Sequence, residues 1–152
     1  MIIISHRGNL NGPNVELEND PSQTLKALSL GFDVEVDVRC CSGKFFLGHD
    51  RSQYEVDEWF LKNPKLWCHA KDLEALNRLL AIDAHCFYHT DEDFVLTSRK
   101  KIWTSYEPRS GCFLVLPHLK TWERGDLWGV NLGDDIGGIC TDFPVSYKDS
   151  RR

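Results

Sequence analysis

The feature of this chain that most limits its fold is a series of eight short, mostly apolar segments with the character of β-strands. Most contain only four or five residues, and the first, residues 2–5, is too uniformly apolar to have one face in water. Such runs suit parallel strands that are buried on both faces. The segments are residues 2–5, 32–39, 66–70, 86–89, 102–105, 112–116, 127–130 and 138–141.

Helix and turn signals separate the first of these runs. Asp20 or Ser22 can cap a helix over residues 22–30, and Asp72 can cap another over residues 73–82. The Ser42-Gly43 pair predicts a hairpin directly after the second strand. The region that follows this hairpin, up to the third strand, is expected to be irregular or partly helical.

The order strand, helix, strand predicts an α/β fold, and eight such strands predict a small (β/α)8 TIM-type barrel in a single domain over residues 1–152. The chain is too short for a complete barrel of this type, so we expect a reduced one. Sharing 152 residues among eight units leaves 19 for each, whereas a full βαβ unit needs roughly 30 or more. We therefore expect several outer helices to be missing, mostly in the second half.

Charge and hydropathy exclude some classes of function. The net charge of −5 argues against a protein that binds nucleic acid through its phosphates. No apolar run approaches the roughly 20 residues of a transmembrane helix, and the N-terminal run is too short for a signal peptide. We expect a cytoplasmic protein whose six cysteines, which include no CxxC pair, are mostly buried and reduced; a zinc site is the alternative.

The strand over residues 32–39 carries acidic residues on one face. Glu35 and Asp37 lie two positions apart, so their side chains point the same way from Cα atoms about 7 Å apart. Both could bind one hard cation such as Mg²⁺ or Ca²⁺. The alternative is a solvated, charged face that also includes Asp33 and Arg39.

Other reactive residues follow the predicted strands, where the active sites of such barrels lie. His6 and His49 would give two imidazoles that titrate near neutrality, as an acid and a base in phosphoester chemistry require. Arg7 and Lys71 could supply positive charge to phosphate oxygens. The alternatives are histidines that only form hydrogen bonds and cations that only keep the surface soluble.

Five short motifs occur in order along the chain: HRG, ELEN, EVDVR, GHD and GICTDFP. Together they resemble the glycerophosphodiester phosphodiesterase family of the phosphatidylinositol-phospholipase-C-like barrel superfamily, whose pattern runs HRG, EN, ExD, HD, ExK and TD-P. The resemblance is dense over residues 2–50, loose over residues 66–71, and returns at the last predicted strand.

The resemblance implies a phosphodiesterase that uses Mg²⁺ or Ca²⁺, with Mn²⁺ as a further option, on a glycerophosphodiester-like or lysophospholipid-like small molecule. In the family's mechanism a neighbouring substrate hydroxyl attacks phosphorus to give a cyclic phosphate, while one histidine removes a proton and the other donates one. Carried over by position, the roles are an acid and base pair (His6, His49), phosphate binding (Arg7, Lys71), metal binding (Glu35, Asp37) and support of the site (Glu18, Asn19, Asp50).

The chain also departs from the family pattern. Its HAK motif has His69 where the family has glutamate, and imidazole suits Mn²⁺ or Zn²⁺ better than Mg²⁺ or Ca²⁺. His69 is the third candidate metal ligand. Two other functions remain open: an impaired barrel that binds a phosphoester or a partner without turnover, and a zinc hydrolase that uses His69 with His49 or His89. The five tryptophans and the strand edges of an open barrel leave room for a homodimer.

Overall fold

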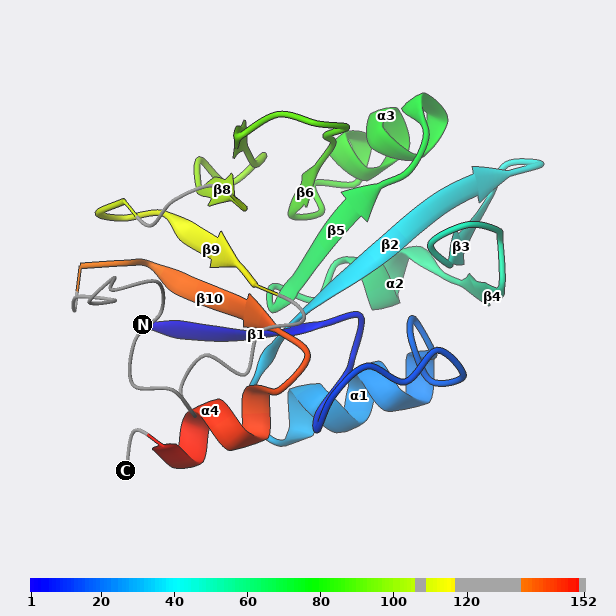
Figure 1. The fold of residues 1–152 in the computed structure, drawn as a ribbon. Helices are drawn as coiled ribbons and strands as arrows, with labels where there is room; N and C mark the ends of the chain where they lie inside the picture. The colour runs from blue at the N-terminus through cyan, green and yellow to red at the C-terminus, as the bar shows by residue number, and fades with distance from the viewer. Residues whose placement is uncertain (106–108, 117–134, 151–152) are drawn as a thin grey trace.

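The computed structural model describes residues 1–105, 109–116 and 135–150, which form ten strands in one mixed sheet together with four helices (Figure 1). The elements are β1 (Ile2–His6), α1 (Pro21–Ser29), β2 (Asp33–Cys41), β3 (Lys44–Leu47), β4 (Tyr54–Val56), α2 (Glu58–Leu61), β5 (Leu66–Ala70), α3 (Leu73–Ala81), β6 (Cys86–Phe87), β7 (Phe94–Leu96), β8 (Ile102–Thr104), β9 (Phe113–Val115), β10 (Gly138–Thr141) and α4 (Pro144–Ser150).

Six parallel ladders join seven of these strands in the order β6-β5-β2-β1-β10-β9-β8. The first and last strands of the chain, β1 and β10, are neighbours in this order. The hairpin of β3 and β4 extends antiparallel from the end of β2, and β7 is antiparallel to β8. Because the seven parallel strands run the same way, their carboxyl ends lie at one edge of the sheet.

The two faces of the sheet have separate cores. On the outer face, alternate residues of β2 such as Val34 and Val36 pack with Ala27 of α1 and Leu79 of α3, and these helices cover that face in Figure 1. On the inner face, a second cluster is mainly aromatic. Its members are Ile4, Trp67, Phe87, Trp103, Phe113 and Cys140.

Ring contacts across the inner face show that the sheet is strongly curved. Trp67 on β5 lies 4.6 Å from Phe113 on β9, and Phe87 on β6 lies 4.8 Å from Trp103 on β8, measured between ring centroids. These strands are not neighbours in the sheet. Within the described residues no ladder joins β6 to β7 or β8, so the closed (β/α)8 barrel stays a prediction.

Most of the elements expected from the sequence are present. The two predicted helices correspond to α1 and α3, where the Asp20 and Asp72 side chains accept hydrogen bonds from the first-turn amides. The hairpin turns at Ser42 and Gly43, which have φ angles of 50° and 72°, as a two-residue turn of this type requires. The structure adds three elements that were not predicted: β4, β7 and α4. The strand predicted over residues 127–130 lies outside the described residues.

All six cysteines are free thiols, and four of them are buried: Cys68, Cys86, Cys112 and Cys140. In the part of the chain that the structure describes, no helix is long and apolar enough to cross a membrane.

Candidate functional site

A cavity of about 400 Å³ opens where the parallel strands end. β1 ends at His6, Glu35 and Asp37 lie on β2, and β5 carries His69. Of the ten site residues predicted from the sequence, seven line this cavity: His6, Arg7, Glu35, Asp37, His49, His69 and Lys71. The other three, Glu18, Asn19 and Asp50, do not line it.

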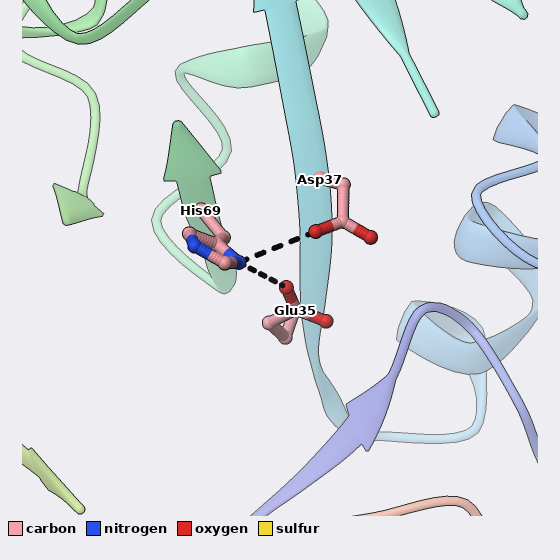
Figure 2. A group of neighbouring side chains, drawn as sticks. All are labelled: Glu35, Asp37 and His69. Carbon is pink, nitrogen blue, oxygen red and sulfur yellow. Dashed lines mark ion pairs between the residues drawn. The ribbon is translucent and has the colours of Figure 1, made fainter. Parts of the chain in front are cut away.

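Three of these side chains form a compact group of possible metal ligands (Figure 2). Nδ1 of His69 lies 3.2 Å from Oδ1 of Asp37 and 3.8 Å from Oε1 of Glu35. One ligand atom from each residue lies within 4.8 Å of the others. Glu35 is 3% exposed and Asp37 is 1% exposed. The alternative of a solvated acidic face is therefore wrong for these two residues.

The remaining oxygens of the two carboxylates are held by the protein. Oδ2 of Asp37 accepts a hydrogen bond of 3.0 Å from Nδ2 of Asn19 and lies 3.1 Å from Nε of Arg7. Oε2 of Glu35 accepts from the backbone amide of Arg7 at 3.3 Å. These contacts leave Oδ1 of Asp37 and Oε1 of Glu35 directed at His69.

The ligand atoms suit a divalent cation. Oδ1 of Asp37 is buried without an aligned hydrogen bond, a situation that buried polar atoms rarely tolerate. Two carboxylate oxygens and one imidazole nitrogen are common ligands of divalent metals. The supporting hydrogen bonds from Asn19 and Arg7 are of the kind that orient metal ligands. The residues present therefore fit such an ion.

Arg7 and Lys71 place two positive charges at the cavity. Arg7 and Gly8 have φ angles of 52° and 83°, so the backbone turns sharply after β1. Nη1 of Arg7 pairs with Glu18 at 3.0 Å, and Nζ of Lys71 lies 3.7 Å from Oδ1 of Asp37. Burial would lower the pKa of Arg7, but Asp37 and Glu35 raise it above its ordinary value. The guanidinium is thus fixed and charged beside the cavity.

His6 is oriented by a carboxylate that the sequence reasoning did not assign. Its Nδ1 lies 2.8 Å from Oδ1 of Asp142, which is fully buried and follows β10. Asn9 donates a second hydrogen bond of 2.8 Å to the same oxygen. With Nδ1 of His6 directed at Asp142, its Nε2 faces Glu35 at 3.9 Å. Asp142 belongs to the TDFP motif, so the signal was present in the sequence.

His49 lies on the loop after β3. Gly48 has a φ of 148°, and a Cβ atom there would lie 2.0 Å from the carbonyl oxygen of Arg51, so only glycine fits. Arg39 donates hydrogen bonds to the carbonyl oxygens of Gly48 and His49. The His49 side chain is 41% exposed and pairs with the exposed Asp50 at 2.7 Å. This pairing lowers the pKa of the Asp50 carboxyl.

The buried ionisable groups influence one another strongly. Burial and the neighbouring Asp37 raise the pKa of Glu35. Burial would also raise the pKa of Asp37, but His69 and Arg7 bring it well below its usual range. Burial lowers the pKa of His6, but the hydrogen bond to Asp142 and the charge of Glu35 raise it above the ordinary value overall. The pKa of Glu35 is thus raised and that of Asp37 is lowered, although both carboxylates belong to one cluster.

The opposite wall of the cavity is aromatic, and it was not predicted. It consists of Phe87, Tyr88, His89 and Trp103 together with Val115. The ring of His69 is parallel to those of Phe87 and His89 within 5°, at centroid distances of 5.1 and 4.4 Å. His89 therefore presents a ring face to His69 and belongs to no ligand group in the described part of the chain. Burial, followed by the charge of His69, lowers the pKa of His89.

Comparison of the chain with protein-family models, with curated proteins and with solved structures gave no match.

Proposed function

We propose that this protein is a metal-dependent phosphodiesterase on a reduced (β/α)8 barrel, resembling the glycerophosphodiester phosphodiesterases. Its substrate would be a small glycerophosphodiester-like or lysophospholipid-like molecule. One observation carries the proposal: a single cavity collects two histidines, two cationic side chains and a buried group of three metal ligands. The motif order in the sequence, which includes several of the same residues, supports the same function.

The charged side chains that line the cavity would bind the phosphate group. Glu35, Asp37 and His69 would hold a divalent cation, with Mg²⁺ or Ca²⁺ expected from the resemblance and Mn²⁺ as a further option. When bound, such an ion supplies positive charge against a phosphoryl oxygen. Arg7 and Lys71 would bind the other oxygens through charge-assisted hydrogen bonds.

The two histidines would move the protons. His6 keeps one proton on Nδ1, against Asp142, so its Nε2 can accept the proton of a substrate hydroxyl as that oxygen bonds to phosphorus. His49 would donate a proton to the leaving alcohol oxygen as its bond to phosphorus breaks. The products are a cyclic phosphate and a free alcohol; attack by water in place of the hydroxyl would give an open phosphate.

A catalytically impaired barrel that binds a phosphoester without turnover is the second candidate. The specific observation that favours it is His69, an imidazole among ligands that would otherwise be carboxylates. The buried pair of His6 and Asp142 weighs against it, because binding alone needs charge but not an oriented proton acceptor.

Phosphorus NMR of the purified histidine variants tests the proposal. We expect His6→Ala and His49→Ala each to lose at least about 100-fold in turnover, the usual contribution of a general acid or base. Lys44→Ala, a surface change on the neighbouring hairpin, is the matched control and should keep full turnover. Circular dichroism would establish that each variant folds. Undiminished turnover in either folded histidine variant would contradict the roles assigned here.

A further inference from the structure

His69 places a nitrogen atom, and not a third carboxylate oxygen, in the ligand group. It lies on β5 directly opposite Asp37 of β2 in the parallel ladder. Its Nδ1 approaches one oxygen of each carboxylate, at 3.2 and 3.8 Å. The residue is buried, with 8% of its surface exposed.

Two neighbouring rings fix the plane of this imidazole. Phe87 and His89 lie parallel to it within 5°, and Phe87 is its register partner on β6. Packed rings on adjacent strands resist rotation about the side-chain bonds. A half-turn within this plane would exchange Nδ1 for a carbon atom, and the two carboxylate oxygens favour the orientation in which Nδ1 faces them.

The positive charges around the ligands reduce the electrostatic attraction for any divalent cation, so the donor atoms decide which ion is preferred. Asp37 is paired with both Arg7 and Lys71, at 3.1 and 3.7 Å. These pairs offset its negative charge, and the affinity of Ca²⁺ sites depends on the number of charged oxygen ligands. Imidazole, in contrast, is a favourable ligand for Fe²⁺, Ni²⁺, Cu²⁺ and Zn²⁺.

From this we infer that the site selects a first-row transition-metal ion over Mg²⁺ and Ca²⁺, and that His69 determines this selectivity. The inference rests on the proposed metal site and specifies its ion. Most sites with nitrogen ligands bind Mn²⁺ more tightly than Mg²⁺. The selectivity ratio is therefore defined as the Kd for Mg²⁺ divided by the Kd for Mn²⁺, and the test is how this ratio changes when His69 alone is replaced.

Isothermal titration of the full chain with Mn²⁺ and with Mg²⁺ measures this ratio. We expect the wild-type ratio to exceed 100, and His69→Glu to reduce it at least tenfold by strengthening Mg²⁺ binding. His89→Phe keeps a ring in the stack and is the matched control, with an unchanged ratio expected. A ratio that is unchanged in folded His69→Glu, or reduced equally in His89→Phe, would overturn the inference.

A readout on the wild-type protein covers the case in which His69→Glu does not fold. With Zn²⁺ as a diamagnetic probe, ¹⁵N NMR of the histidine rings should show a large shift of Nδ1 of His69 on binding. No response from this nitrogen at saturating Zn²⁺ would overturn the inference.

Both readouts are separate from turnover. Selective binding of Mn²⁺ without turnover of any phosphodiester would leave the inference standing while the proposed function failed. Equal turnover with Mg²⁺ and Mn²⁺, together with an unresponsive His69, would overturn the inference and leave the proposed function standing.

Discussion

Nδ1 of His6 lies 2.8 Å from Oδ1 of Asp142, although 136 positions separate the two residues in the sequence. Their approach follows from the sheet. The last strand, β10, pairs in parallel with the first, β1, and Ser5 lies opposite Thr141. The next residue of each strand is therefore His6 and Asp142. The candidate site is complete only when the two ends of the described fold are side by side.

Asp142→Asn should impair turnover without removing the metal ligands. The amide cannot stabilise a protonated imidazole as the carboxylate does, so we expect a loss of about 100-fold or more. In the metal-free protein the pKa of His6 should fall, because burial lowers it and the negative charge of Asp142, which raises it, is removed. Proton NMR titration of His6 measures the pKa. Turnover within twofold of wild type, or an unchanged pKa, would contradict the role of Asp142.

Arg39→Gln should reduce turnover by releasing the loop that carries His49. Arg39 is the side chain that holds the carbonyl oxygens of Gly48 and His49, and hydrogen bonds to charged groups contribute about 1.5–3 kcal/mol. We expect kcat to fall about tenfold while the dissociation constant for the metal stays the same. Arg99→Gln is the control, because Arg99 pairs with Asp83 at the surface. Equal kcat values for Arg39→Gln and the control would refute this positioning role.

Local signals in the sequence were sufficient for much of the fold. The capping residues Asp20 and Asp72, the turn at Ser42 and Gly43, and the apolar strands at residues 66–70 and 138–141 all depend on neighbours within a few positions. β4 and β7 were missed because each has only three residues and forms a short antiparallel pair with the adjacent strand, β3 or β8. The helix α4 begins at Pro144, has only seven residues and lacks a strong apolar period.

The site itself could be predicted in part. Glu35 and Asp37 share a face because of the two-residue period of a strand, and that argument needs no tertiary structure. Their burial could not be inferred, because it depends on β5 lying alongside β2. The contact of His6 with Asp142 and the aromatic wall likewise arise from strand order, which one sequence does not reveal.

Asn19 should support both stability and metal affinity. It is buried, donates to Oδ2 of Asp37 and accepts from the amide of Asp37. Removing both hydrogen bonds in Asn19→Gly should lower the free energy of unfolding by about 2 kcal/mol. Asn19→Ala should cost about 1 kcal/mol more, because the φ angle of 61° is unfavourable for alanine. Urea denaturation measures both variants, and metal affinity should fall about 10- to 100-fold.

The opposite order of stability, with Asn19→Ala more stable than Asn19→Gly, would contradict the backbone part of that account. Unchanged metal affinity in both variants would contradict the support of Asp37.

His85 should make the protein less stable in acid. Burial, followed by the charges of Arg99 and Lys101, lowers its pKa from 6.5 to about 4. The unfolded chain therefore takes up a proton before the folded protein does, and the unfolding free energy falls as the pH drops from 6.5 to 4. We expect His85 to contribute about 1 to 2 kcal/mol to this loss. Urea denaturation of wild type and His85→Gln should differ in slope over this range; parallel curves would contradict the assignment.

The central claim is that this cavity breaks phosphodiesters with the help of a divalent ion. Phosphorus NMR of the wild-type protein, incubated with a panel of glycerophosphodiesters and lysophospholipids, tests it most directly. Mg²⁺, Ca²⁺ and Mn²⁺ would be supplied in turn and then removed with a chelator. The account predicts a new phosphate resonance, cyclic or open according to its chemical shift, that forms with metal and stops forming after chelation. Product that forms at the same rate in the chelator, or no product with any ion, would contradict it.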